Sequence, residues 1–592
     1  MLRNLLSIFT ILLLVVFISG LAQAELSKTM PEKDCRLIKG DEPLNQADYY
    51  PYTPGTITES PGEIVGVTYY DYQTNGSCGN RVALCDDGSM YFCWMMLEGW
   101  PYPPAARHVY YNWIDPEGNW YAEGTGGQVS ENSGSGYTNL DVMNGNIGVL
   151  FYHWSTTVSE NYASTEWDPP GMGFFTHNLA PNEVFPQTPD SPGIIIWPYG
   201  TVDGNNNIHM IASENTTQRI QRLGYTRSED GGETWSTVQL VDTAMVIGTV
   251  IDASPVSNKV VVAYPKTQDT TTQWNNDIVY FASDDGTTWD WRYGMVNVTN
   301  YLTDDDSLWA YTDLDVIIDY NDYIHLIWNT QWVTDEGIYY RTFLHHYSEE
   351  TEEITEITAK PDSLWTSVSG AWNRPICKMN MGILEEPHTL YATWTQFDTS
   401  DVSAGGYGNG DLFMSYSTDG GANWEAPENM TDSHTPGCFP GECDSDHWST
   451  LADVVEGPFP GQLHVFYTND KDAGGIPQEE GAATENPMKY MVFGPSGVDV
   501  KDNRPVNFSL NQNYPNPFNA KTTISFELKE NSPVMINVYD ITGAKVTTLV
   551  DNVMTAGNHD IVWDAADVAS GVYYYKLTAG DAAETKQAVL IK

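Results

Sequence analysis

One pattern recurs along the chain: a short apolar triplet that follows a turn and returns about every 62 residues. Most of these turns are rich in Asp, Asn and Gly, as in DDGS and VDGNNN. The middle residues of the seven triplets are Tyr91, Leu150, His209, Val261, His325, Tyr391 and His464. An aromatic-rich second strand follows each triplet, and the apolar residues alternate in short runs without a long helical period. The sequence therefore predicts an all-β protein built from repeated small sheets.

Seven units, each with room for two further strands, predict a seven-bladed β-propeller. A six-bladed ring is the alternative if one terminal unit is an addition to the ring. The stretch EIVGVTYYDYQ near residue 63 is expected to complete the last blade, because closing the ring removes exposed sheet edges. His209, His325 and His464 occupy equivalent places in the repeat, so we expect them to pack between blades rather than to form a metal triad.

Three of the second strands run into similar turns, SEDGGETW, SDDGTTW and STDGGANW. In such a turn Asp accepts backbone N–H bonds, Gly takes a positive φ, and Trp packs under the neighbouring strand. The turns resemble the Asp boxes of sialidase-like propellers, and the resemblance covers residues 59–497. It implies a structural role, away from the central funnel, for Ser228, Asp230, Gly232, Trp235, Ser283, Asp285, Trp289, Ser417, Asp419, Gly421 and Trp424.

The sialidase resemblance also implies a catalytic set: three arginines that clamp the substrate carboxylate, a Tyr nucleophile paired with Glu, and an Asp acid/base. Arg81 in NRVALCDDGSMYF and Arg374 in NRPICKMNM stand at matching starts of two units and are the candidates for the clamp. Ala replaces the family's Pro after Arg81, and a role at the surface or between blades is the alternative for both arginines. No nucleophile can be assigned among the 36 tyrosines.

The N-terminus predicts export. Arg3 precedes an apolar run that ends at Ala22-Gln23-Ala24, which predicts a cleaved signal peptide over residues 1–24 and no membrane span in the mature chain. Residues 25–58 form an N-terminal extension. Cys438 and Cys443 in CFPGEC are expected to form a disulfide in the oxidising environment outside the cell, and the pairing of the other cysteines stays open.

The charge limits the partners. A net charge of −52 excludes nucleic acid as a partner. The abundant carboxylates suggest one cofactor, a structural calcium ion, for which Asp470 and Asp472 are the candidate ligands.

The C-terminal part has a different pattern. After a polar linker at residues 498–506, alternating strands over residues 507–592 predict a small immunoglobulin-like β-sandwich. Its stretches NYPNPFN (513–519), VYD (538–540) and ASGVY (569–573) resemble the C-terminal sorting domain of the type IX secretion system. The resemblance implies transport across an outer membrane by that machinery, followed by secretion or attachment to the cell surface.

Three hypotheses remain for the propeller. We favour a module that binds glycans or another extracellular ligand without turnover. The first alternative is an enzyme, a sialidase, related glycoside hydrolase or lyase that acts in the funnel. The second is a surface scaffold for adhesion or protein interaction. Because one fold hosts many functions, the residues at the funnel must decide between them. The oligomeric state is left open.

Overall fold

The computed structural model describes residues 60–97, 106–155, 159–182, 185–189, 191, 193–216, 220–245, 247–268, 276–301, 308–334, 337–358, 369–455, 461–494, 508–510, 513–528, 532–540, 545–566, 568–579 and 582–592. The predicted signal peptide (1–24), extension (25–58) and linker (498–506) lie outside these residues. The chain divides into a large unit that ends at Asp499 and a small unit that begins at Val500. Both are built from strands, as the sequence predicts, and the described part contains one short 3₁₀ helix, η2 (Ile476–Gln478).

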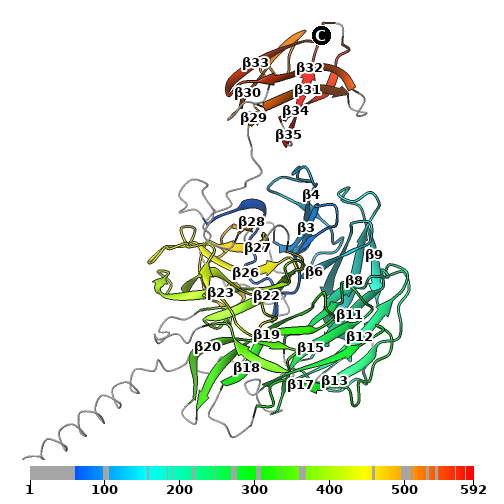
Figure 1. Cartoon of the computed structure of the whole chain (residues 1–592), viewed down its shortest axis with the longest axis vertical. Coiled ribbons are helices and arrows are strands. Elements are labelled where there is room, and N and C mark those ends of the chain that lie inside the picture. Colours follow the sequence, from blue (N-terminus) through cyan, green and yellow to red (C-terminus); the bar gives the residue numbers. More distant parts are fainter. Residues whose placement is uncertain are drawn as a thin grey trace, which may run out of the picture. The chain divides into compact units, whose positions relative to one another are not determined.

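The strands described in the large unit form four antiparallel sheets of four strands and one of twelve strands (Figure 1). Only single residue pairs, Met245 with Lys266 and Asn276 with Ala310, join the three parts of the twelve-stranded sheet, so we group the strands into seven blades of four. Blade 1 contains β2 (Val82–Leu84), β3 (Met90–Met96), β4 (His108–Ile114) and β5 (Gly127–Gln128). Blade 2 contains β6 (Ser135–Met143), β7 (Ile147–Ser155), β8 (Ser159–Glu166) and β9 (Phe175–Ala180). Blade 3 contains β10 (Ile195–Val202), β11 (Ile208–Glu214), β12 (Gln221–Ser228) and β13 (Gln239–Met245).

The remaining blades follow the same order. Blade 4 contains β14 (Val250–Ala253), β15 (Val260–Thr267), β16 (Asn276–Ser283) and β17 (Val296–Asn297). Blade 5 contains β18 (Leu308–Ile318), β19 (Ile324–Thr334), β20 (Gly337–Ser348) and β21 (Glu353–Glu356). Blade 6 contains β22 (Ile376–Leu384), β23 (Thr389–Val402), β24 (Gly408–Ser417) and β25 (Glu428–Asn429). Blade 7 contains β26 (Ser445–Leu451), β27 (Leu463–Asp470), β28 (Asn486–Phe493) and the N-terminal strand β1 (Glu63–Thr68).

The N-terminal strand closes the ring. Strand β1 pairs antiparallel with β28, so the first described strand is the outermost strand of the last blade. This is the closure that the stretch near residue 63 predicts. Each first strand faces the centre and contacts the first strand of the following blade, from β2 to β26. The guanidinium of Arg81 in blade 1 donates to the backbone carbonyl of Trp448 in blade 7 and links the two ends of the ring.

The repeated turns have the hydrogen bonds that their sequence predicts. In residues 228–235, Ser228 donates to Asp230 at 2.9 Å and accepts from the Gly232 N–H at 2.9 Å. Residues 417–424 repeat both bonds from Ser417, and residues 283–289 place Asp285 as the acceptor of two backbone N–H groups. We call these three segments the box turns. Each follows the third strand of its blade, and its Trp packs against a core between blades.

The recurring histidines have structural partners. His209 contacts Asp203 at 3.3 Å in blade 3, and His325 contacts Asp319 at the same distance in blade 5. The same His–Asp contact thus recurs in the hairpin between the first two strands of both blades. His464 stacks on Tyr490. All three histidines are buried. They hold hairpins and neighbouring strands together, in agreement with their expected packing role.

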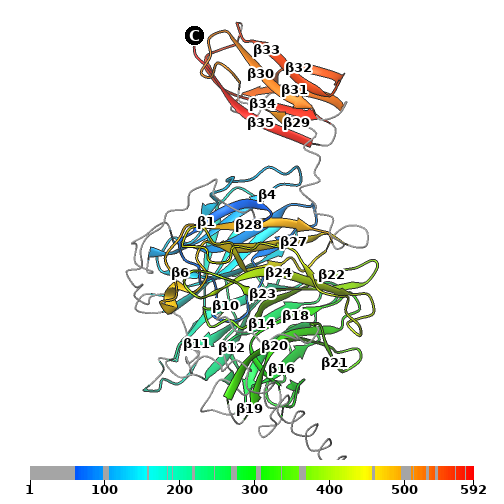
Figure 2. The ribbon, with the colours of Figure 1, turned by 90° about the vertical axis from the view of Figure 1, so that its left-hand side faces the viewer.

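The small unit consists of two sheets (Figure 2). One contains β29 (Phe508–Leu510), β30 (Lys521–Leu528) and β33 (Gly557–Asp564). The other contains β32 (Lys545–Met554), β31 (Ser532–Asp540), β34 (Gly571–Ala579) and β35 (Ala582–Leu590). Phe518, Ile536 and Trp563 belong to one buried apolar cluster that both sheets share. In the described residues, no helix is long and apolar enough to cross a membrane.

Candidate functional site

The first strands of four blades share an irregularity near their start. Each contains a bulge, and in each bulge one residue other than Gly has a positive φ: Tyr137 (54°), Trp197 (60°), Lys378 (52°) and Trp448 (54°). Such a conformation costs about 1–3 kcal/mol and persists where the surroundings enforce it. The side chains meet: Tyr137 is 6.2 Å from Trp197, and the Lys378 ammonium is 4.6 Å from the Trp448 ring. These four bulges bring large side chains together at one end of the central channel, which the first strands of the blades surround.

Four buried cationic side chains lie at this end, on the first strands or in segments packed against them. Each contacts an aromatic ring. The distance to the ring centroid is 6.0 Å for Arg81 over Phe466, 5.7 Å for Arg107 over Tyr137, 4.0 Å for Arg374 over Tyr311 and 4.6 Å for Lys378 over Trp448. We call Arg81, Arg107, Arg374 and Lys378 the channel cations. They are four of the 27 lysines and arginines in a chain with a net charge of −52, and burial of such residues is uncommon.

Arg107 belongs to a compact group with a histidine and a tyrosine. Its Nη2 is 3.5 Å from Nε2 of His153, and the His153 ring stacks on Tyr137 with centroids 5.2 Å apart. Burial, with the Arg107 charge beside it, lowers the pKa of His153 well below its usual value, so the imidazole is neutral. Its Nδ1 atom has no hydrogen-bond partner among the described residues. The group therefore combines a fixed positive charge, a neutral base and a phenol.

The segment from Tyr69 to Asn80 runs through the same end of the channel. The Lys378 ammonium donates to the Gly76 carbonyl at 2.8 Å and pairs with Asp313 at 3.1 Å. The Leu314 N–H donates to the Ser77 hydroxyl at 3.2 Å, and the Tyr199 hydroxyl donates to the Ser77 carbonyl. One segment thus contacts blades 3, 5 and 6, and it contacts two of the channel cations, Lys378 through the Gly76 carbonyl and Arg107 through the Tyr70 ring.

The two predicted clamp arginines both lie at this end. Arg81 directly precedes β2, and Arg374 lies two residues before β22. Arg374 donates from Nε to Gln331 at 3.1 Å. Sequence reasoning missed Arg107, His153 and Lys378, because they match no family motif and come from different blades. The clamp role and the nucleophile remain predictions.

The candidate calcium ligands are buried at the end of β27, where Asp470 is its last residue, and just after it, at Asp472. Asp470 contacts His447 at 3.3 Å, and Asp472 accepts the Ala482 N–H at 2.6 Å. Within the described ranges, no three His, Cys, Asp or Glu side chains are gathered as metal ligands would be. The structural calcium ion stays a prediction.

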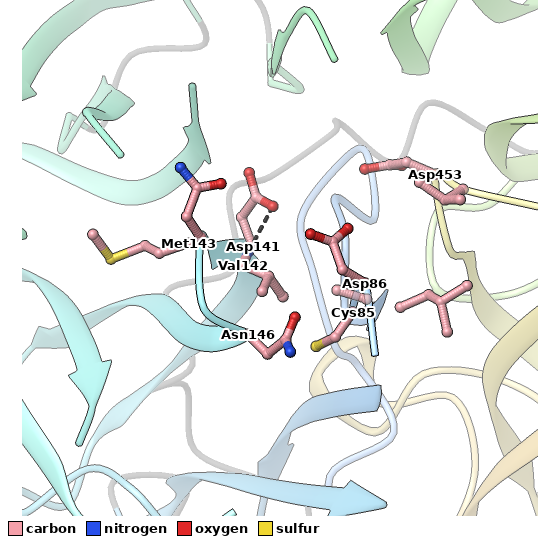
Figure 3. Close-up of a pocket in the computed structure, with 11 residues that line it drawn as sticks. Cys85, Asp86, Asp141, Val142, Met143, Asn146 and Asp453 are labelled. Carbon is pink, nitrogen blue, oxygen red and sulfur yellow. Dashed lines mark hydrogen bonds between the residues drawn. The ribbon is translucent and has the colours of Figure 1, made fainter. Parts of the chain in front are cut away.

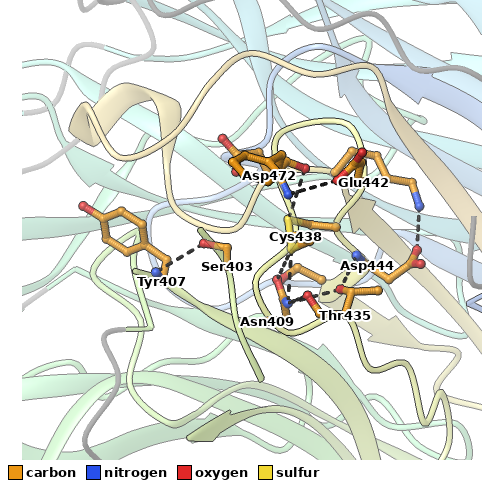
Figure 4. The surroundings of a disulfide bond; sticks show 12 residues. Ser403, Tyr407, Asn409, Thr435, Cys438, Glu442, Asp444 and Asp472 are labelled. Carbon is orange, nitrogen blue, oxygen red and sulfur yellow. Dashed lines mark hydrogen bonds and ion pairs between the residues drawn. A yellow bond between two sulfur atoms is a disulfide. The ribbon is translucent and has the colours of Figure 1, made fainter. Parts of the chain in front are cut away.

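A disulfide joins Cys438 and Cys443 in the loop before β26 (Figure 4). The Gly441 N–H in this loop donates to the Lys471 carbonyl at 2.8 Å. The disulfide loop is therefore fixed to the segment that follows β27. Cys78, Cys85, Cys93 and Cys377 are buried free thiols.

The opposite end of the channel is acidic. A pocket of about 170 Å³ there is lined by Asp86, Asp141 and Asp453, which come from blades 1, 2 and 7 (Figure 3). Further carboxylates of the first strands tie neighbouring blades together: Asp252 accepts the Ile318 N–H, and Asp315 accepts the Met381 N–H. Burial raises the pKa of Asp315 to about 7. Burial, followed by the charges of Asp252, Asp315 and Asp141, raises the pKa of Asp453 well above its usual value.

These channel carboxylates give the stability of the large unit a pH dependence. Asp315 keeps its proton up to a pH of about 7 in the folded chain, whereas the unfolded chain releases it near pH 4. The folded state therefore binds more protons between these values, and its stability falls as the pH rises through the folded pKa. Buried histidines act in the opposite sense only below about pH 6.5. We therefore expect the unfolding temperature of the wild type, relative to that of Asp315→Asn, to fall between about pH 4 and 7 and to level off above this range.

Calorimetry of the wild type and Asp315→Asn over this pH range checks the expectation. Asn retains an oxygen that can accept the Met381 N–H but cannot titrate, so the fall should be smaller in the variant. An equally steep fall in both proteins would remove Asp315 as its source.

Comparison with known proteins separates the two units. Residues 512–592 match the family of secretion system C-terminal sorting domains. No curated protein matches the chain. Among solved structures, the polysaccharide lyase Uly1 is 11% identical, with 77% of this chain and 98% of that chain covered and a TM-score of 0.41. The Hadza microbial sialidase Hz136 is 12% identical, with 66% and 74% covered and a TM-score of 0.34.

A third similar structure is the α-L-arabinofuranosidase Arb93A from Fusarium graminearum, bound to an iminosugar inhibitor. It is 12% identical, with 65% of this chain and 98% of that chain covered and a TM-score of 0.33. The family match, by contrast, covers most of the small unit and agrees with the sequence stretches that start at Asn513. Residues 512–592 are thus a sorting domain of the type IX secretion system, and the protein is exported by that system to the cell surface or the medium.

Proposed function

We propose that the propeller binds an acidic glycan at the channel end that holds the channel cations. The observation that carries the proposal is the burial of Arg81, Arg107, Arg374 and Lys378 beside aromatic rings in a protein with a net charge of −52. A guanidinium group matches a carboxylate or sulfate with two parallel hydrogen bonds, and aromatic rings pack against the C–H faces of sugars. An acidic sugar presents both features at once.

Two nitrogen atoms of the Arg81 guanidinium support the proposal, because they lack hydrogen-bond acceptors among the described residues. Its Nη2 donates to the Trp448 carbonyl, whereas Nε and Nη1 have no hydrogen-bond partner in the part of the chain that the structure describes. A buried charged donor without an acceptor is costly, and an anionic ligand would remove that cost. Because the channel cations are buried, binding requires that neighbouring residues, such as Gly76 beside Lys378, move.

A specific observation favours cleavage by elimination as a second candidate. His153 is neutral and stacks on Tyr137, and Arg107 stands beside it. In a uronic acid polymer, His153 would take the proton from the carbon next to the carboxyl group while Arg107 holds the carboxylate charge. The C–H electrons then form a C=C bond, the bond to the glycosidic oxygen breaks, and that oxygen takes the proton of Tyr137. The proton returns from His153 to Tyr137 through solvent.

Calorimetric titration with polygalacturonate, alginate and hyaluronan, against neutral dextran, tests binding. We expect the acidic polymers to bind and the affinity to fall with added salt, since the contact is ionic. Arg107→Met should weaken binding roughly tenfold or more. Arg227→Met is the matched control: it removes a cation on β12 that pairs with the exposed Glu229, and it should bind like the wild type. Equal binding by all three proteins, or no preference over dextran, contradicts the proposal.

The same polymers separate binding from cleavage. Elimination creates an unsaturated uronate with a characteristic ultraviolet absorbance, which hydrolysis does not produce. If the protein is a lyase, the absorbance grows with time and His153→Ala abolishes its growth while retaining affinity. Binding without any such product leaves the protein a glycan-binding module.

A further inference from the structure

Blade 2 has an unusual connection between its third and fourth strands. In blades 3, 4 and 6 the residues after the third strand form the box turns. In blade 2 the same place, between β8 and β9, is taken by residues 167–174, WDPPGMGF. The box-turn tryptophans Trp235, Trp289 and Trp424 are half-buried against neighbouring cores. The connection in blade 2, by contrast, exposes its large apolar side chains to solvent.

The segment 167–174 presents three large apolar side chains to solvent. Trp167 is 56% exposed, Met172 50% and Phe174 55%. The Trp167 and Phe174 rings lie 5.7 Å apart with a tilt of 33°. The Trp167 indole N–H donates to the Thr176 hydroxyl at 2.9 Å, which fixes the orientation of the ring. We call Trp167, Met172 and Phe174 the rim platform.

The platform stands on a rigid base. The buried carboxylate of Glu166 accepts the N–H groups of Gly171 at 3.0 Å and Gly173 at 2.9 Å, and it also accepts the Tyr91 hydroxyl. Both glycines have a positive φ, and a Cβ at either would collide with Trp113 or Tyr121. A buried acid and two obligatory glycines thus hold the loop in one shape. A preformed surface of this kind loses little conformational entropy when it binds.

We infer that the rim platform is a second binding site, which takes uncharged sugar units of a polysaccharide. Asp168 is the one charged residue in the sequence from 167 to 174, and no Lys or Arg lies there, so the loop gives an anionic ligand no counter-charge. A stable protein interface needs about 20–30 residues a side, far more than this loop supplies, whereas one or two sugar rings fit two adjacent aromatic faces. The protein is exported to the cell surface or the medium, and polysaccharides are accessible to it there. The inference does not depend on the channel cations.

Native affinity electrophoresis of the full mature chain tests the site. The gels contain xyloglucan, arabinoxylan, galactomannan or mixed-linkage β-glucan. We expect at least one polymer to retard the wild type, and Trp167→Ala or Phe174→Ala to weaken that affinity roughly tenfold or more. Tyr293→Ala removes another aromatic side chain, 75% exposed and located after the box turn of blade 4, and should leave the affinity unchanged. The variants should share the wild-type unfolding temperature, because all three side chains are exposed.

Two results would overturn the inference. One is the absence of retardation by every polymer in the panel. The other is sedimentation velocity that shows self-association of the wild type, lost in Trp167→Ala, which would assign the platform to a second copy of the chain. Arg107→Met should leave retardation by neutral polymers intact, so failure at the channel and failure at the platform are distinguishable.

Discussion

Deletion of residues 507–592 abolishes display of the protein on the cell surface or in the medium, and the shortened chain accumulates inside the outer membrane. We expect this complete loss because the sorting domain is a separate unit with its own buried core of two sheets. The propeller should still fold, since β1 and β28 close its ring without the small unit. Cell fractionation and immunoblotting measure the distribution, and circular dichroism of the shortened chain checks its β content.

Two single substitutions in the full chain test whether export needs the folded sorting domain or only the presence of its sequence. Phe518 is buried against Trp563, with ring centroids 5.2 Å apart, and its backbone bonds to Val589 and Ile591 in the last strand and after it. Truncation of a buried Phe to Ala costs about 3–5 kcal/mol, so Phe518→Ala should reduce export strongly. Val553→Ala changes a side chain that is 76% exposed and should be exported normally. Surface display of the shortened chain would show that export does not depend on the domain.

Much of the fold is predictable because its signals are local. Strand alternation, the spacing of the triplets and the hydrogen bonds of the box turns all act within one blade, and each blade repeats them. Ring closure by β1 follows from the same pattern. The stretch near residue 63 precedes the first repeat and belongs to no unit, and the last unit lacks a fourth strand that this stretch can supply. The sorting domain is equally readable, because its stretches are contiguous in the sequence.

The candidate site is less predictable because it is assembled across blades. Arg81 and Arg374 could be found, since each stands at the start of a unit. Arg107 and His153 come from blades 1 and 2, and only the ring geometry brings them within 3.5 Å. The positive φ of Lys378 leaves no trace in the sequence, because Lys seldom adopts it. The rim platform could not be predicted for another reason. The exposure of Trp167 depends on the three-dimensional shape of its loop, which the sequence alone does not show.

Lys378 should be the most sensitive position in the channel. Its ammonium pairs with Asp313 at 3.1 Å, donates to the Gly76 carbonyl and lies over the Trp448 ring, and both charged side chains are nearly inaccessible to solvent. Lys378→Met keeps the length of the side chain but leaves the Asp313 carboxylate buried without its counter-charge. Breaking a buried pair from one side costs about 3–5 kcal/mol, so we expect a large fall in the free energy of unfolding of the propeller. Denaturant titration, followed by tryptophan fluorescence, measures the change.

The cause of that fall can be separated from the loss of contacts at Lys378. In the double variant Lys378→Met/Asp313→Leu no charge is left unpaired, and replacement of a buried pair by apolar side chains is often neutral. The double variant should therefore be more stable than Lys378→Met alone. Glu229→Gln removes the exposed partner of Arg227 and should change the free energy by at most about 1 kcal/mol. If the double variant is as unstable as the single one, the packing of Lys378 on Gly76 and Trp448, rather than its charge, holds the segment in the channel.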